Sequence, residues 1–195
     1  MTQEYPTSLG TSDADTITLL GQNLAEDLMG KVGFGELTFW MVTQRRPTPS
    51  EVRVFESVLV ALADHGFTPT AIAARLTYLS APDSVQGALA AGLLGGGSRF
   101  LGVTEDTGKF LAAALEAVGR VHPRVLGRTL PLNGAGTSGA ALADLGLPPD
   151  LLRGFALLAR TAGLLGHLAE EQRRPIGMDV YLTVDRNADY QPPEH

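Results

Sequence analysis

The chain has 195 residues and a mass of 20.5 kDa, a length that suits one domain, or one large domain with a smaller one. Hydrophobic residues make up 44% and charged residues 18% of the chain, which is typical of a globular protein and excludes a disordered or collagen-like one. The lack of cysteine excludes a disulfide framework, thiolate zinc sites and a cysteine nucleophile. The net charge of −6 opposes nucleic acid and anionic membranes as partners.

Four histidines are left for metal or proton chemistry, and the sequence predicts no metal site. No stretch approaches the roughly 20 apolar residues that a membrane-spanning helix needs. The first residues lack the basic and apolar regions of a signal peptide. We therefore expect a cytoplasmic protein. Apart from Lys31 and Lys109, the basic residues are arginines, whose planar guanidinium suits carboxylate and phosphate groups.

The first part of the chain predicts little regular structure. Residues 1–15 are rich in Thr, Ser, Gly and Asp and predict an irregular arm, and residues 16–20 predict a short extended piece. Apolar residues then recur at helical spacing in two short segments, at 24–29 and 35–42.

The first long helix is predicted from Pro49 to Asp64 or His65. Thr48 can cap it, Pro49 suits the first helical position, and Glu51 three residues after the cap completes a capping box. Its apolar residues cover most of its circumference, which predicts a buried helix.

Further helices follow with short connections and no convincing strand, so the fold class is all-α. They are expected at 68–79, 84–94, 104–118, 137–144 and 149–174. Residues 119–132 are the least helical internal stretch, and residues 176–195 predict an extended arm. Several helices are apolar nearly all round, which is more apolar surface than one small core uses. We therefore expect a homodimer.

One arginine stands in an apolar environment. Arg160 lies on the same helix face as Arg153, His167 and Arg174. Arg153 and Arg174, at the two ends of this face, are expected to meet solvent. The neighbours of Arg160 in the chain are leucines and alanines, where a guanidinium without an anion is costly. Two partners remain open for it, a carboxylate of the protein or a carboxylate of a ligand.

For other motifs, a purely structural explanation stands beside the functional one. The spacing of Gly134, Gly136 and Gly139 matches a dinucleotide fingerprint, but no strand–helix–strand unit surrounds it, so we reject that interpretation. His65 follows Asp64 at a helix end, where the helix dipole favours a protonated imidazole. A basic cluster could bind phosphate or form a solvated loop; its members are Arg120, His122, Arg124 and Arg128.

Several segments taken in order resemble the citrate synthase superfamily, and within it the citryl-CoA lyases and the C-terminal module of ATP citrate lyase. The resemblance covers residues 16–175. Its main carriers are LADHG at 62–66, GLLGGGSRFLG at 92–102 and LARTAGLLGH at 158–167. The resemblance implies an all-helical homodimer built on a citrate-synthase-like large domain, with the long C-terminal helix forming the dimer. Residues 1–15 and 176–195 are then arms outside this domain.

The resemblance also implies site residues. His65 would be the catalytic residue and would bind substrate together with Arg160 and Arg99. Gly95, Gly96, Gly97 and Arg124 would bind a coenzyme A thioester, which is a substrate, so that no tightly bound cofactor is expected. The other ligand would be a di- or tricarboxylate, and the reaction would make or break the carbon–carbon bond between acetyl-CoA and oxaloacetate.

Two departures from the family pattern leave a second function open. The family reads Asn-Val-Asp-Gly where this chain has Asn133, Gly134, Ala135 and Gly136, so the catalytic aspartate position holds alanine. The small helical domain expected before that motif is reduced to residues 119–132. The alternative is therefore a catalytically deficient homodimer that binds a CoA ester or dicarboxylate, or acts as a scaffold.

Overall fold

The computed structural model describes residues 6–116 and 134–191. Helices dominate this part of the chain, which confirms the predicted all-α class. They are α1 (Phe34–Thr43), α2 (Pro49–Ala63), α3 (Pro69–Ser80), α4 (Val85–Leu94), α5 (Ser98–Leu101), α6 (Val103–Glu116), α7 (Gly134–Asp144), α8 (Leu152–Arg173) and α9 (Gly177–Arg186). A π-helical turn covers Leu24–Leu28, and a 3-10 turn, Pro149–Leu151, leads into α8. None of the helices described is long and apolar enough to cross a membrane.

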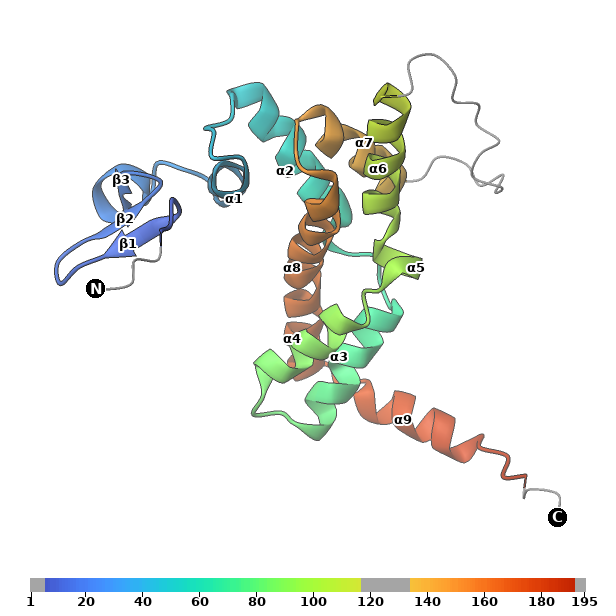
Figure 1. The fold of residues 1–195 in the computed structure, drawn as a ribbon. Coiled ribbons are helices and arrows are strands. Elements are labelled where there is room, and N and C mark those ends of the chain that lie inside the picture. The colour runs from blue at the N-terminus through green and yellow to red at the C-terminus, as the bar shows by residue number, and fades with distance from the viewer. Residues whose placement is uncertain (1–5, 117–133, 192–195) are drawn as a thin grey trace, which may run out of the picture.

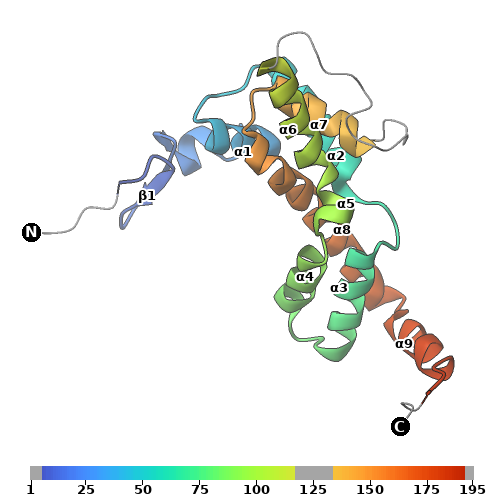
Figure 2. The same ribbon diagram turned by 45° about the vertical axis from the view of Figure 1, so that its right-hand side comes forward.

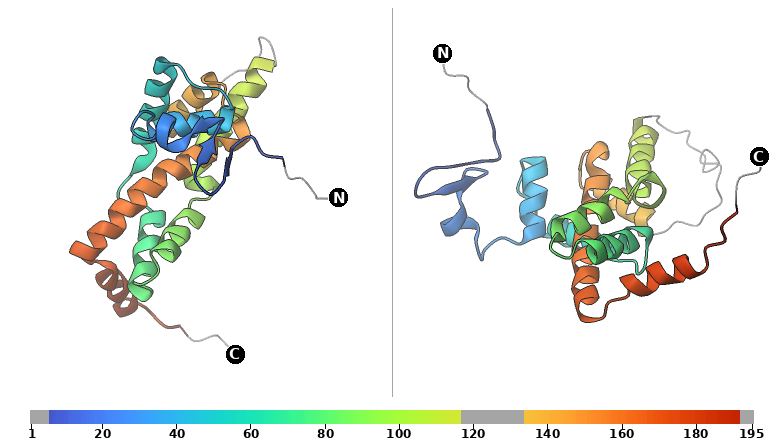
Figure 3. Two further views of the ribbon diagram at one scale, coloured as in Figure 1. Left: turned by 90° about the vertical axis from the view of Figure 1, so that its left-hand side faces the viewer. Right: turned by 90° about the horizontal axis from the view of Figure 1, so that it is seen from below.

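The long helix α8 is the axis of the fold. Helices α2, α6 and α7 pack along its N-terminal half, and the antiparallel pair α3 and α4 packs along its C-terminal half (Figures 1 and 2). The N-terminal strands and α9 project from opposite sides of this body (Figure 3). The helices therefore meet around the middle of α8, which is the part of the chain that carries Arg160.

Two apolar clusters hold the helices together. The larger one centres on Phe55, whose ring makes edge-to-face contacts with Phe39 and Phe155 at centroid distances of 5.6 and 5.3 Å. The smaller one joins Ala71, Ala74 and Ala88 of α3 and α4 to Leu164 and Leu168 of α8. Small residues between α3 and α4 let these two helices lie close together.

Local capping signals define the helix starts as predicted. The Thr48 hydroxyl accepts the Glu51 N–H, and the Glu51 carboxylate accepts the Thr48 N–H, so the capping box is complete. Thr68 and Ser84 cap α3 and α4 in the same way with their hydroxyls. Gly66, at a φ of +70°, makes the turn between α2 and α3 that a side chain would strain.

Two predictions at the ends of the chain are wrong. Gly10–Ser12 (β1) is not irregular but pairs antiparallel with Ile17–Leu19 (β2), which pairs in turn with Gln22–Asn23 (β3). The Asp13 carboxylate, which accepts the N–H groups of Asp15 and Thr16, closes the β1–β2 turn.

At the other end, residues 177–186 form α9 rather than an extended arm. Its N-cap residue, Ile176, has no capping side chain, so the sequence around it carries no start signal. The cap comes instead from Glu171 of α8, whose carboxylate accepts the N–H groups of Ile176 and Gly177 at 2.9 and 2.7 Å.

The prediction that α2 is buried all round is also wrong for a single chain. Phe55 and Val58 face the core, but Val54 and Val60 are 41% and 74% exposed. Phe55 and Val58 are the buried residues of the helix, so only one stripe of it packs on the core.

Candidate functional site

A pocket of about 330 Å³ opens where several helices converge on the middle of α8. The end of α2, the start of α3, the α5–α6 junction and the start of α7 form its other walls. Among its lining residues are Asp64, His65, Thr70, Phe100, Thr104, Ala135 and Arg160. The fold thus brings His65 and Arg160, which the sequence singled out separately, into one cavity.

Arg160 is a buried charge with unused hydrogen-bond donors. Its side chain is 8% exposed, and within the described part of the chain neither Nε nor Nη1 has a hydrogen-bond acceptor. The carboxylate closest to it, among those the structure describes, is Asp64, with 3.9 Å between Nη1 and Oδ1, which is beyond hydrogen-bond distance. Of the two partners that the sequence left open, the protein carboxylate is therefore at ion-pair distance but not hydrogen bonded, and the guanidinium lines the pocket with two donors unused.

His65 enters the pocket from the turn after α2. It is exposed, and no hydrogen bond to its imidazole occurs within the described chain. Its position after the helix rather than in it leaves both ring nitrogens available to a ligand.

Asp64 is the carboxylate in the described lining of the pocket, and it is firmly held. Its Oδ1 lies 3.0 Å from Nε2 of His167, and its Oδ2 accepts the Gly66 N–H at 2.9 Å. Burial raises the pKa of the Asp64 carboxyl, but the hydrogen bonds from the Gly66 and His65 N–H groups and the His167 imidazole outweigh burial. The net pKa lies below its ordinary value of 3.8, so Asp64 is ionised at neutral pH.

A polar network continues behind Asp64. Arg75 of α3, buried among α3 and α8, lies with Nη2 3.0 Å and Nε 3.3 Å from Nδ1 of His167. Arg75 also pairs with Glu170, and its Nη1 donates to Glu171 at 2.6 Å. Burial raises the pKa of the Glu171 carboxyl, but hydrogen bonds from the Gly177 N–H, Arg75 and the Ile176 N–H outweigh burial. The pKa of Glu171 therefore lies below its usual range. The network links the pocket to the start of α9.

The glycine-rich segment lies next to the pocket rather than in its lining. Gly95, Gly96 and Gly97 connect α4 to α5, and Gly96 is buried against Leu101. Arg99, on α5, is exposed and is absent from the pocket wall, whereas its neighbour Phe100 lines it. The segment thus places α5 at the rim of the cavity.

Helix α7 begins at the pocket with Gly134 and Ala135. Ala135 offers the cavity a methyl group where the family pattern has a carboxylate. The three glycines of the rejected dinucleotide motif lie within the first turns of α7, and a Cβ at Gly139 would come within 2.5 Å of the Thr104 carbonyl oxygen. Close packing of α7 on α6 therefore explains the last of these glycines.

The predicted CoA contact Arg124 lies outside the described residues, as does the rest of its basic cluster, Arg120, His122 and Arg128.

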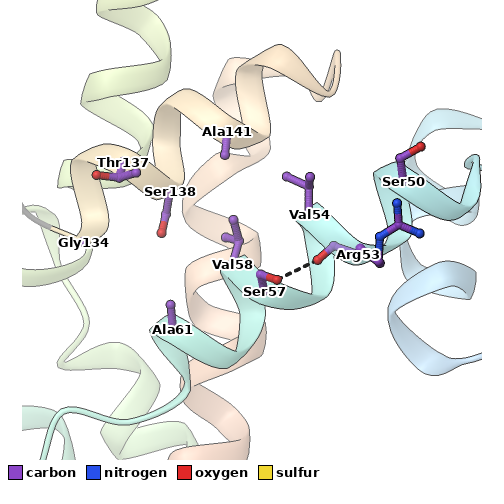
Figure 4. A pocket seen from close by; sticks show the side chains of 10 residues that line it. All are labelled: Ser50, Arg53, Val54, Ser57, Val58, Ala61, Gly134, Thr137, Ser138 and Ala141. Carbon is purple, nitrogen blue, oxygen red and sulfur yellow. Dashed lines mark hydrogen bonds between the residues drawn. The ribbon is translucent and has the colours of Figure 1, made fainter.

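A second cavity, shallow and about 580 Å³ in volume, lies between α2 and α7 (Figure 4). Its walls are mainly apolar or hydroxyl-bearing, with Val54, Val58 and Ala61 on α2 and Ala141 on α7. Arg53 is the charged residue of its lining. It lacks the convergent polar groups of the first pocket, so we take the first pocket as the candidate site.

Sequence reasoning missed Asp64 and Arg75 as members of the site. Arg75 lies in an alanine-rich helix and is buried there. A charged residue in such an apolar helix was the signal that could have identified it. The sequence placed His167 only on a basic helix face, whereas in the structure His167 lies between Arg75 and Asp64.

Comparison with known proteins connects this site to a fold. No family model and no curated protein matches the chain. Citryl-CoA lyase from Hydrogenobacter thermophilus superposes with a TM-score of 0.79 at 24% identity, over 99% of this chain and 97% of that one.

Two ATP citrate lyase structures also match. The enzyme from Methanothrix soehngenii, in complex with citrate and coenzyme A, gives a TM-score of 0.76 at 17% identity. An aspartate-to-alanine mutant of the Methanosaeta concilii enzyme, in complex with (3S)-citryl-CoA, gives 0.74 at 17% identity. Both matches cover 100% of this chain and 42% of the other. The fold predicted from the resemblance is confirmed.

Proposed function

We propose, from the fold shared with citryl-CoA lyase, that this chain binds a di- or tricarboxylate and a CoA thioester and acts on the carbon–carbon bond between acetyl-CoA and oxaloacetate. The observation that carries the proposal is the buried Arg160, which lines a pocket that also contains His65 and whose Nε and Nη1 have no hydrogen-bond acceptor among the residues the structure describes. A guanidinium binds a carboxylate through two parallel hydrogen bonds, and a substrate carboxylate would supply the missing acceptors.

The residues divide the work of the reaction. Arg160 would fix one carboxylate of citryl-CoA, and His65 would stabilise the oxygen on the carbon that becomes the oxaloacetate carbonyl. In cleavage, the hydroxyl loses its proton, the carbon–carbon bond breaks with its electron pair going to the acetyl-CoA enolate, and a proton is added to the enolate carbon. Condensation is the reverse and gives citryl-CoA, and water must then hydrolyse the thioester of citryl-CoA before free thiol is released. We propose Arg99 as a further substrate contact, and Gly95, Gly96, Gly97 and Arg124 as contacts to the CoA thioester.

The alternative, binding without turnover, is favoured by Ala135. A methyl group can neither remove a proton from acetyl-CoA nor return one to its enolate. In that case the chain would hold the same ligands in a catalytically deficient site.

Ligand binding can be tested by thermal unfolding of the full chain with citrate, oxaloacetate, CoA or acetyl-CoA. A ligand at 100 times its Kd stabilises by about 2.7 kcal/mol, which for a chain of this size raises Tm by about 5–10 °C. We expect R160Q to lose the citrate shift. The control R173Q removes an exposed arginine near the end of the same helix and is expected to keep it. If no ligand shifts the wild-type Tm, both functions are wrong.

Turnover separates the two functions. We expect the wild-type chain to release acetyl-CoA from citryl-CoA, or free thiol from acetyl-CoA and oxaloacetate, and H65A to abolish this. If the wild type binds ligands but shows no turnover, the alternative holds. A135D should then gain activity, because it restores a carboxylate to the pocket wall.

The same proposal includes the assembly and the domain plan. We propose a homodimer in the cytoplasm, in which exposed apolar side chains such as Val60 and Leu94 are covered by the second copy. Residues 16–175 would form the citrate-synthase-like domain, with residues 119–132 in place of a full small domain.

A further inference from the structure

Asp64 and Arg160 form an unusual pair of opposite charges. Both line the pocket, and Oδ1 of Asp64 lies only 3.9 Å from Nη1 of Arg160, yet no hydrogen bond joins them. A carboxylate and a buried guanidinium this close normally form a charge-assisted hydrogen bond. The Asp64 side chain is 50% exposed, so packing alone does not hold it away.

Two hydrogen bonds hold Asp64 where it is. His167 Nε2 contacts Oδ1 at 3.0 Å, and the Gly66 N–H donates to Oδ2 at 2.9 Å. The second bond belongs to the turn after α2 and keeps the carboxylate next to its own backbone. The first crosses to α8 and occupies the oxygen that faces Arg160.

The role of His167 as a donor is set by Arg75. Two N–H groups of Arg75 point at Nδ1 of His167, and an arginine has donors only. Nδ1 must therefore accept, which assigns the imidazole proton to Nε2, the nitrogen that faces Asp64. Arg75 itself is fixed by its pair with the buried Glu171, so this tautomer has rigid support.

We infer that Asp64 is an internal competitor for the carboxylate site at Arg160, and that His167 is a positioning residue that holds it off and leaves the guanidinium open to a ligand. The inference rests on the proposed function, in which Arg160 binds a carboxylate. It gives this site a residue that controls its affinity without touching the ligand.

The test measures citrate binding by calorimetry in four full-length variants and one full-length control variant. In H167A, Asp64 is released and pairs with Arg160, so citrate affinity falls about tenfold or more, the range of one charge-assisted hydrogen bond. H167Q should bind like the wild type, because a glutamine amide can accept from Arg75 and donate to Asp64. D64N removes the competing charge, so D64N binds at least as tightly as the wild type, and H167A/D64N binds like D64N. D83N, a loss of an exposed carboxylate elsewhere, controls for net charge.

Two results would overturn the inference: unchanged citrate affinity in H167A, or an equal loss in H167A whether residue 64 is Asp or Asn. The second result would mean that His167 acts only through the structure of the pocket. A ligand-free measurement separates this inference from the proposed function. The ¹⁵N–¹H signals of the Arg160 guanidinium should shift on ion pairing in H167A but not in H167A/D64N. If they do and no variant binds citrate, His167 still holds Asp64 away from Arg160, but the proposed function fails, and with it the competition for a ligand carboxylate.

Discussion

At Arg160, the stability of the fold and the binding of a ligand make opposite demands on one residue. Its side chain is 8% exposed and two of its nitrogens lack acceptors, so the folded chain carries the desolvation cost of a charge without the hydrogen bonds that normally offset it. A residue that served only the fold would not be an arginine here. Such local cost is typical of binding sites, where the ligand completes the interactions.

We therefore expect R160M to be more stable than the wild type in the absence of ligand, by about 1–2 kcal/mol, because it replaces an uncompensated buried charge with an apolar chain of similar length. The measurement is urea unfolding at neutral pH. R153M on the same helix is the control. Arg153 Nε also lacks an aligned hydrogen-bond acceptor, but it lies 2.8 Å from a Glu105 carboxylate oxygen, and because this ion pair offsets the burial of the charge we expect no gain from its removal. A destabilised R160M would show that the pocket already satisfies this charge.

The cap residue Glu51 gives a pH-dependent prediction. Hydrogen bonds from Arg45, and then from the Thr48 N–H and hydroxyl, lower the pKa of Glu51 from 4.5 to about 2. Because the folded pKa lies below the unfolded one, its contribution to stability is fully present above about pH 4.5 and is lost as the pH falls toward 2. The Tm difference between wild type and E51Q, measured from pH 7 to pH 2, should shrink over that interval. A constant difference would mean that the charge of Glu51 contributes nothing.

At the scale of elements, the start of a helix can be predicted when its capping residue directly precedes it in the sequence. It cannot be predicted when the cap comes from another helix. Thr48, Thr68 and Ser84 are read directly from the sequence because each caps the helix that follows it. Helix α9 was missed because its cap, Glu171, comes from the preceding helix and also serves Arg75. The β1–β2 hairpin was missed because its strands are three residues long and none of their residues is fully buried.

The crossing of α8 over the end of α2 depends on one glycine. A Cβ at Gly163 would lie 2.1 Å from the Ala63 carbonyl oxygen, which is backbone and cannot turn aside. We expect G163A to destabilise the fold by about 1–3 kcal/mol and to displace Asp64, which follows Ala63. G166A, three residues along the same helix with no atom within 4 Å of its Cβ, should instead stabilise by about 0.5–1 kcal/mol. Urea unfolding of both variants tests this, and equal effects would contradict it.

At the scale of the whole molecule, many large apolar side chains of the described residues are exposed. On α9 alone Met178, Tyr181 and Val184 follow one another at helical spacing and are 49%, 52% and 69% exposed. Val60 and Leu94 are exposed as well. We therefore expect a second copy of the chain to cover these side chains.

Light scattering after size exclusion should therefore give twice the 20.5 kDa mass of one chain. V184E should lower the dimer fraction, because it places a charge on the apolar face of α9. T183E, on another face of the same helix, is the matched control. A monomeric wild type at micromolar concentration would contradict the proposed assembly.

The whole-molecule scale also limits what the sequence could predict of the site. His65 and Arg160 were accessible because each stands in a recognisable motif. The bond between Asp64 and His167 joins residues 103 positions apart and depends on how α8 crosses α2, which no local pattern encodes. Likewise, Arg160 was recognised as needing an anion, but only the fold shows that the nearby carboxylate is held by another residue.

The hydrogen bonds from Arg75 to His167 also bear on proton traffic. A histidine buried beside an active site often shuttles protons, which requires its far nitrogen to exchange them with water. Here that nitrogen, Nδ1, faces an arginine that stays protonated and can only donate. The imidazole is thus a dead end for proton transfer. A proton consumed or released in this pocket is therefore not relayed through His167 to the wall behind Asp64.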